Sequence, residues 1–313
     1  MIGHAARRSL AIVAGLLVVF ALSGCGGSGD DAAQTTGAIA PSDGPPIRIG
    51  AKNFTEQAIL GELYRLALEA KGFEVVRKAD VGSTEIIHRA LRRGALDMYP
   101  EYVGVLLSEV AEDRSRPRSA AAAYEVAKRY EERGGFTLLA QTPFSDSNAL
   151  AVKPDFARRH KLRTIADLRR LEGTVEVGAL PEFRTRFEGL DGLEEVYGLR
   201  NLRVAPVRAD GRYAALDSGE VDVASVFTTE GQLASDRYVV LDDTEGLFAS
   251  GHVAPIISTA ILEAHGARLQ TTIDAVSKAL TTPAMREMNA AVDLRNRRPV
   301  DVAAGFLRAN KLP

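Results

Sequence analysis

The stretch "IRIGAKNFTEQAILGELYRLALEAKGFEVVRKADVGSTEIIHRALRRGALDMY", residues 47–99, alternates short β-rich runs with amphipathic helical ones. "IRIGA", "FEVVRKA" and "ALDMY" are typical of strands, and "STEIIHRALRRG" is typical of a helix. In "TEQAILGELYRLALEAKG", Gly72 stands where a left-handed helix cap is expected, and one helical face carries the apolar residues Ile59, Leu63, Leu66, Ala67 and Ala70. This βαβαβ order predicts a mostly parallel sheet covered by helices, and therefore an α/β fold.

A second series of strands and helices begins near Asn148. "NALAV", "TVEVGA", "LRVAPV", "VDVASVF" and "RYVVL" are predicted strands, with helices expected over "TIADLRRLE", "LDGLEEVYG" and "GRYAALDSG". Strand-like stretches near 149–152 and 254–258 stand at both boundaries of this series, so the chain is expected to cross between two lobes twice. We assign residues 47–147 and 254–313 to lobe I and residues 148–253 to lobe II.

An internal echo links the two series. "ALRRGALD" (90–97) and "ALDSGEVD" (215–222) share a helix end, a glycine and the start of a strand. The loops that follow, "YPEY" and "FTTEG", are therefore expected at the carboxyl edge of each sheet, where open α/β sheets bind ligands.

The N-terminus is typical of an export signal. Arg7 and Arg8 precede an apolar run, Leu10–Leu22, whose 13 residues are too few for a stable membrane span. "LSGC" resembles the lipobox of bacterial lipoproteins, so we expect cleavage after residue 24 and lipid on Cys25, the only cysteine. Residues 25–46 are rich in Gly, Ser, Asp and Pro and predict a flexible tether. The mature protein is then anchored on the extracytoplasmic face of the membrane.

Composition and motifs exclude several classes of protein. Without residues 1–24 the chain holds 37 basic and 41 acidic residues, and no basic stripe with aromatics occurs, which argues against nucleic-acid binding. The five histidines are scattered, and neither a P-loop nor a G-x-G-x-x-G motif is present, so we expect no enzyme, cofactor or metal site. His88, beside Arg89, is expected on a solvated helix face.

The cluster "DMYPEYVG", residues 97–104, concentrates tyrosines and carboxylates in one short segment. In an extended chain Tyr99 and Tyr102 point to opposite faces, and Pro100 is expected to prevent simple strand pairing. Tyr102, with Asp97 and Glu101 nearby, suits a quaternary ammonium, which is held by ring faces and negative charge. In the alternative interpretation, Asp97 caps backbone amides and Tyr99 packs in the core.

These residues resemble a known family. "IRIGAKNFTEQAILGELYRLALEAKGFEV", "GSTEIIHRALRRGALDMYPEYVG", "LEEVYGL" and "YAALDSGEVDVASVFTTEG" are similar to segments of the glycine betaine, carnitine and choline (osmoprotectant) substrate-binding proteins of ABC transporters. The resemblance covers Ile47 to the C-terminus. It implies a two-lobed periplasmic-binding-protein fold of the second type, a monomer that holds solute in a cleft between the lobes and signals to a membrane permease by closing.

The resemblance also implies an aromatic box for the trimethylammonium group. Tyr102 and Tyr213 match two of its tyrosines, whereas Asn148 stands at a third position and Gly251 or His252 at a fourth. Each cation–ring contact is worth roughly 0.5–2 kcal/mol, so losing two weakens quaternary-ammonium binding by about one to three powers of ten. Asn148 and His252 would add hydrogen-bond partners, which suits a more polar solute.

The anionic end of a solute has candidate partners at the edge of the first sheet. Lys52 and Asn53 follow the first predicted strand. Ser83 and Thr84 begin a helix, where free backbone amides and the helix dipole favour a carboxylate. For Ser83 a role as the helix N-cap is equally expected.

Further candidates come from the second series. Arg186, in "EFRTRFEG", aligns with a recurrent arginine of the family, and Arg184 is the competing candidate for a bidentate contact. Thr228 and Thr229 lie in the loop "FTTEG" and are expected to complete a polar rim.

The sequence thus predicts an extracytoplasmic receptor of an ABC importer for an osmoprotectant such as glycine betaine, choline or carnitine. The alternative is a surface lipoprotein that binds another small polar or aromatic solute for uptake or sensing. An enzyme on the same scaffold is a third hypothesis, because fold alone does not decide activity.

Overall fold

The computed structural model describes residues 44–113, 117, 119–208, 211–248 and 250–313. The predicted signal sequence, Cys25 and all but the last three residues of the tether lie outside the described residues. What is described belongs to one compact unit of the chain, Ile39–Pro313. Among the described helices, none combines the length and apolar character that a membrane span requires.

The first sheet has five strands in the order β2-β1-β3-β10-β4. Strand β1 pairs in parallel with β2 and β3, and β10 pairs antiparallel with β3 and β4. The strands are β1 (Ile47–Gly50), β2 (Val75–Lys78), β3 (Met98–Tyr102), β4 (Phe136–Leu138) and β10 (Val253–Ser258).

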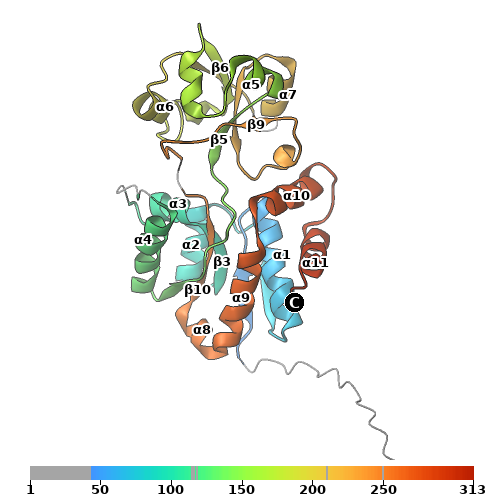
Figure 1. Ribbon diagram of the computed structural model, residues 1–313. Coiled ribbons are helices and arrows are strands. Elements are labelled where there is room, and N and C mark those ends of the chain that lie inside the picture. Colours follow the sequence, from blue (N-terminus) through green and yellow to red (C-terminus); the bar gives the residue numbers. More distant parts are fainter. Residues whose placement is uncertain (1–43, 114–116, 118, 209–210, 249) are drawn as a thin grey trace, which may run out of the picture. The chain divides into compact units, whose positions relative to one another are not determined.

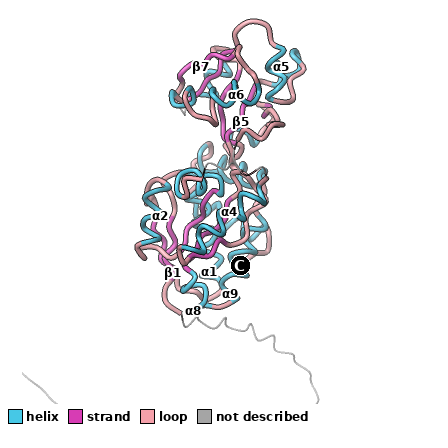
Figure 2. The backbone as a smooth tube through the Cα atoms, turned by 90° about the vertical axis from the view of Figure 1, so that its left-hand side faces the viewer, coloured by secondary structure: helices cyan, strands magenta, loops and turns pink. Residues whose placement is uncertain are grey.

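Helices cover both faces of this sheet (Figures 1 and 2). Alternate strand residues serve the two faces, so Met98 and Tyr102 pack toward α1 while Tyr99 packs toward α2. Helix α1 in turn contacts α9, α10 and α11. The bounds are α1 (Thr55–Ala70), α2 (Thr84–Arg92), α3 (Val103–Val105), the π-helix η1 (Leu106–Val110), α4 (Ala120–Arg133), α8 (Thr259–His265), α9 (Ala267–Ala279), α10 (Thr282–Asp293) and α11 (Pro299–Ala309).

The second sheet has the order β7-β6-β8-β5-β9. Strand β6 pairs in parallel with β7 and β8, and β5 pairs antiparallel with β8 and β9. The strands are β5 (Asn148–Val152), β6 (Val175–Ala179), β7 (Leu202–Pro206), β8 (Val223–Phe227) and β9 (Val239–Val240). Around them lie α5 (Pro154–His160), η2 (Ile165–Arg170), η3 (Pro181–Arg184), α6 (Leu190–Tyr197), α7 (Arg212–Ser218) and η5 (Gly231–Ala234).

The two sheets are topological equivalents. Each has three parallel strands, then an antiparallel strand and an edge strand, and the echoed segments lead into β3 and β8, the central strands. The chain passes from β4 to β5 and returns from β9 to β10, so the two predicted crossings are confirmed. The α/β class is confirmed as well, with the refinement that both sheets are mixed. Gly72 has the expected left-handed conformation, with φ of 80°.

The expectation for Pro100 is wrong. Pro100 lies inside β3 and is paired with Pro255 of β10. In an antiparallel ladder every second pair exchanges no backbone hydrogen bonds, so two facing prolines, which lack N–H groups, fit at such a pair. The Pro100 carbonyl accepts a hydrogen bond from Gln57 Nε2 at 3.1 Å.

Candidate functional site

Lys52 lies just beyond β1 and is paired inside the protein. Its Nζ contacts Glu101 Oε1 at 2.5 Å and Thr84 Oγ1 at 2.9 Å, and all three side chains are buried. Removing one partner of a buried ion pair leaves an uncompensated charge, which is strongly destabilising. The Lys52 ammonium is therefore held in place by Glu101. Lys52 and Thr84 were predicted as separate contacts for a solute; the structure makes them one polar network at the edge of the first sheet.

Tyr102 ends β3 and belongs to an aromatic pair. Its ring is stacked on Phe54, with centroids 6.1 Å apart, and Lys52 Nζ lies 4.9 Å from the Tyr102 centroid. Tyr102 is buried, whereas Phe54 is 43% exposed. An exposed ring offers its face to a cation, so Phe54 is a candidate that sequence reasoning missed. The signal was an aromatic residue directly before a helix, in "KNFTEQ".

Glu56, in the first turn of α1, was also missed by sequence reasoning. It is 3% exposed, and its two carboxylate oxygens accept hydrogen bonds from Tyr102 Oη at 2.8 Å and Asn289 Nδ2 at 2.9 Å. Asn289 Nδ2 also donates to the Thr229 carbonyl at 2.8 Å. Burial raises the pKa of Glu56, and hydrogen bonds from Thr229, Asn289 and Tyr102 oppose this shift. Thr229, a predicted contact, thus meets Tyr102 through Glu56 and Asn289.

Tyr213 lies in the first turn of α7 and belongs to the second sheet's own core. Its hydroxyl donates to Glu230, whose other carboxylate oxygen contacts Arg212 Nη2 at 2.5 Å. Its ring packs on Tyr238 with a centroid separation of 4.8 Å. Burial raises the pKa of Tyr213, and the charge of Glu230 raises it further. Nearby, Phe227 is 40% exposed beneath the Arg212 guanidinium.

Arg286, on α10, is a half-buried cation beside the loop that follows β8. Its Nε donates to the Thr228 carbonyl at 2.6 Å. Among the described residues no carboxylate forms an ion pair with it, and burial lowers its pKa. Arg286 and Asn289 are three residues apart in one helix, which places them on the same face about 5–6 Å apart at Cβ. A guanidinium without an anionic partner is suited to a carboxylate of a bound solute.

The other predicted site residues have local partners or lie exposed. Asn148 Nδ2 donates to Glu188 at 2.7 Å, and His252 Nδ1 lies 2.9 Å from the carbonyls of both Thr142 and Phe144. Ser83 is the backbone N-cap of α2, and its hydroxyl donates to Glu85. Asn53 and Arg186 are exposed, and Arg184 donates to the Val204 carbonyl at 2.9 Å. The geometry therefore gathers Lys52, Thr84, Tyr102 and Thr229, but gives Asn148 and His252 structural partners.

Two interpretations were open for the cluster at residues 97–104: a solute site, or structural roles for Asp97 and Tyr99. Asp97 Oδ2 accepts a hydrogen bond from the Arg48 backbone amide at 2.8 Å, and its carboxylate also pairs with the Arg48 guanidinium. Tyr99 is completely buried. The alternative interpretation is confirmed for these two residues, which leaves Tyr102 and Glu101 as the part of the cluster next to the candidate site.

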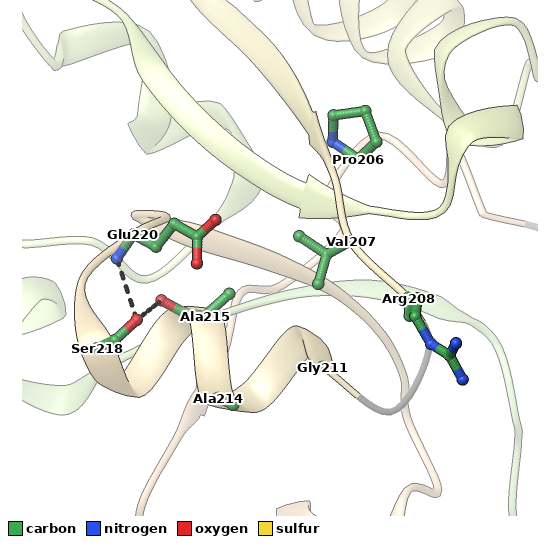
Figure 3. Close-up of a pocket in the computed structure, with 8 residues that line it drawn as sticks. All are labelled: Pro206, Val207, Arg208, Gly211, Ala214, Ala215, Ser218 and Glu220. Carbon is green, nitrogen blue, oxygen red and sulfur yellow. Dashed lines mark hydrogen bonds between the residues drawn. The ribbon is translucent and has the colours of Figure 1, made fainter.

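A surface hollow lies elsewhere, between the end of β7 and helix α7 (Figure 3). Ser218 there accepts a hydrogen bond from the Glu220 amide and donates one to the Ala215 carbonyl. Its lining residues are Pro206, Val207, Arg208, Gly211, Ala214, Ala215, Ser218 and Glu220. It contains none of the predicted contacts. In the described part of the chain no group of His, Cys, Asp and Glu could hold a metal ion.

Comparisons with known proteins find similarity along most of the chain. The family model described as the substrate binding domain of ABC-type glycine betaine transport systems matches residues 45–309. The glycine-betaine-binding protein of Pseudomonas aeruginosa is 32% identical over 277 residues, covering 85% of this chain and 88% of the relative. The carnitine transport binding protein OpuCC of Listeria monocytogenes is 28% identical, covering 84% of this chain and 86% of the relative. A solved glycine betaine/carnitine/choline ABC transporter structure is 23% identical with a TM-score of 0.80, covering 85% of this chain and 99% of that one, which shows a shared fold.

Proposed function

The chain belongs to the family of substrate-binding domains of ABC-type glycine betaine transport systems, and on this premise we propose that it delivers a small zwitterionic osmoprotectant to a membrane permease. The solutes we propose are glycine betaine and carnitine, with choline as a cationic relative of the same class. The proposal rests on the chemistry of the side chains that the fold brings together around Tyr102.

One observation carries the proposal: hydrogen bonds through Asn289, Thr229 and Thr228 link the groups suited to the two ends of a zwitterion. For the cation there are the exposed ring of Phe54, the ring of Tyr102 and the carboxylate of Glu56. For the carboxylate there is Arg286, one helical turn from Asn289, which itself bonds to Glu56. A quaternary ammonium needs ring faces and negative charge, and a carboxylate is best held by a guanidinium.

The contacts predicted from the sequence remain part of the proposal. We retain Lys52, Asn53, Ser83, Thr84, Tyr102, Asn148, Arg186, Tyr213, Thr229 and His252 as candidate contacts in a cleft between lobe I (47–147 and 254–313) and lobe II (148–253). Only a solute that touches both lobes has a higher affinity for the closed state, which is how binding would be signalled to the permease.

With this role we also propose a lipid anchor, a monomeric state and the lack of enzymatic activity. Lipid on Cys25 would keep the receptor beside its permease, and residues 25–46 would serve as the tether. We propose a monomeric receptor without enzymatic activity, since its family consists of transporter substrate-binding domains. If the protein serves in sensing, its protein partner is not a permease, but its solute site is the same.

The proposal is tested by titration calorimetry of the purified protein with glycine betaine, carnitine and choline. Replacing Arg286 by Gln should weaken betaine binding by about 10- to 100-fold, because charge-assisted hydrogen bonds are worth roughly 1.5–3 kcal/mol. Choline has no carboxylate, so its affinity should change by less than about twofold. Arg186→Gln tests the competing candidate for the anion partner, an exposed arginine.

Either arginine can emerge as the anion partner. If Arg186→Gln weakens betaine and Arg286→Gln does not, the family-based assignment of Arg186 is right and the role of Arg286 is wrong. If none of the three solutes binds, the receptor role for osmoprotectants fails, and the fold and family remain.

A further inference from the structure

Two carboxyl groups from distant parts of the chain meet beside Tyr102. Glu56 comes from the first turn of α1, and Asp146 lies in the segment that leads from β4 to β5. The two are close enough to repel each other electrostatically. Thr229 contacts both, through hydrogen bonds that favour their ionised forms. Two carboxylates that repel each other in a site shielded from water are costly to ionise together without a compensating positive charge.

The side-chain donors that bond directly to Glu56 are already in use. Tyr102 Oη donates to Glu56, and Asn289 Nδ2 donates to Glu56 and to the Thr229 carbonyl. Lys52, whose positive charge acts on Glu56, is bound to Glu101 at 2.5 Å. The third carboxylate nearby, Glu230, repels Asp146 and is itself held by Arg212 and Tyr213.

Two acceptors in this cluster have no partner among the described residues. Asp146 Oδ1 is buried without a hydrogen bond, and so is Asn289 Oδ1. Asn289 is 4% exposed, and its amide group lies within the cluster because its Nδ2 binds Glu56. A buried acceptor left unpaired costs about 1–3 kcal/mol. Asn289 Oδ1 is an acceptor, and Asp146 Oδ1 is one when its carboxyl is ionised, so the group missing from the ionised cluster is a donor.

One proton resolves the charge conflict in the empty protein. Burial raises the pKa of Asp146 well above its ordinary value, and the negative charge of Glu56 raises it further. Burial also raises the pKa of Glu56, but three hydrogen-bond donors oppose this effect. The negative charge is therefore assigned to Glu56 and the proton to Asp146.

We propose that Glu56, Asp146 and Asn289 form a cation subsite of the solute site, which holds one proton when empty and releases it when a cationic group with N–H donors binds. The inference rests on the proposed function and narrows its solute class. A protonated amine can donate to Asp146 Oδ1 and Asn289 Oδ1, whereas a trimethylammonium group cannot. The released proton passes from the Asp146 carboxyl to the solvent.

Glycine, sarcosine, dimethylglycine and glycine betaine provide matched probes, because they differ only in how many N–H donors the methyl groups replace. Titration calorimetry of the full chain in two buffers of different ionisation heat counts the protons released. We expect about one proton per molecule of dimethylglycine, and affinity about tenfold higher than for betaine, since one hydrogen bond to a charged group is gained. As long as Asp146 is protonated in the empty protein, affinity should rise with pH, by up to about tenfold per pH unit.

Asp146→Asn tests the source of the proton. This variant should bind dimethylglycine without proton release and with affinity that no longer changes with pH. Asp236→Asn, at an exposed carboxylate, should keep both effects. The proton count of the unaltered protein needs no variant, so the test stands even if Asp146→Asn does not fold.

The outcomes separate this subsite from the receptor role. The subsite is overturned if dimethylglycine binds without proton release, or if dimethylglycine and betaine bind with equal affinity. Water would then be the partner of the two orphan acceptors. The receptor role stands in either case. Absence of binding by the whole series also overturns the subsite. Binding of choline or carnitine in that case preserves the receptor, and failure of these solutes as well removes it.

Discussion

His88 shows how far a single residue can depart from its sequence context. It was expected on a solvated helix face beside Arg89, and this is wrong, because His88 is 4% exposed. Its Nδ1 lies 3.1 Å from the Tyr99 hydroxyl, and its Nε2 lies 3.9 Å from Glu131 Oε1. Burial lowers the pKa of His88 to about 4, with a contribution from the charge of Arg92. Burial raises the pKa of Glu131 to about 7.

These two residues affect the pH dependence of stability in opposite directions. Glu131 binds a proton more tightly in the folded state, so its contribution is present below about pH 4.5 and is lost as the pH rises through about 7. His88 binds a proton less tightly in the folded state, so its contribution is present above about pH 6.5 and is lost as the pH falls through about 4. Between about pH 4.5 and 6.5 the two largely offset each other.

Glu131→Gln should expose the His88 effect. The free energy of unfolding of this variant is expected to rise by up to roughly 3 kcal/mol as the pH increases from about 4 to 6.5, and then to level off. Urea unfolding at a series of pH values measures it. His88→Asn is the complementary control, and its stability should fall as the pH rises from about 4.5 to 7. A Glu131→Gln curve parallel to that of the unaltered protein would show that Glu131 titrates normally.

At the scale of elements, α10 positions the loop that follows β8. Arg286 and Asn289 bond to the carbonyls of Thr228 and Thr229, and α10 packs directly on η5. Gly231 makes this approach possible, because a Cβ there would lie 2.6 Å from the Ala290 backbone. Helix α10 therefore carries two candidate site residues, Arg286 and Asn289, whose hydrogen-bond partners lie in the loop after β8 of the second sheet.

Gly231→Ala should separate α10 from this loop. Overpacking at a close contact typically costs about 1–3 kcal/mol, and the displaced Arg286 and Asn289 should also weaken solute binding. Urea unfolding and calorimetry measure the two effects. Gly305→Ala is the control: Gly305 lies within α11, where an added Cβ would meet no atom within 4 Å, so alanine should stabilise the helix by about 0.5–1 kcal/mol. Unchanged stability in Gly231→Ala would mean that α10 moves freely relative to η5.

At the scale of the whole molecule, two equivalent sheets each contribute one central strand to the candidate site. The two-lobed periplasmic-binding-protein fold of the second type, expected from the family resemblance, is confirmed by the likeness to solved structures. Each sheet has its own buried core, formed on both of its faces. A solute that is bound by residues of both sheets binds only when both are folded, so it raises the free energy of unfolding of the whole protein.

Solute binding should accordingly raise the melting temperature of the protein. At a free solute concentration of about 100 times Kd, stability increases by about 2.7 kcal/mol, which corresponds to roughly 5–10 °C for a protein of this size. Differential scanning calorimetry with glycine betaine measures the shift. Phe54→Ala removes an exposed ring, so it should leave the empty protein nearly unchanged and reduce the shift. An equal shift in this variant would remove Phe54 from the site.

Patterns along the chain were enough to predict β1, α1, β2, α2 and β3 in order, the equivalence of β3 and β8, the left-handed cap at Gly72 and the opposite faces of Tyr99 and Tyr102. These features depend on periodicity and turn chemistry among near neighbours, which are readable along the chain. The tertiary structure alone decided that Lys52 pairs with Glu101, 49 residues away, and that Asn289 reaches Glu56, 233 residues away. Partner choice and pKa depend on which segments meet and how far water is excluded, and both are set only when the sheets and the C-terminal helices have packed.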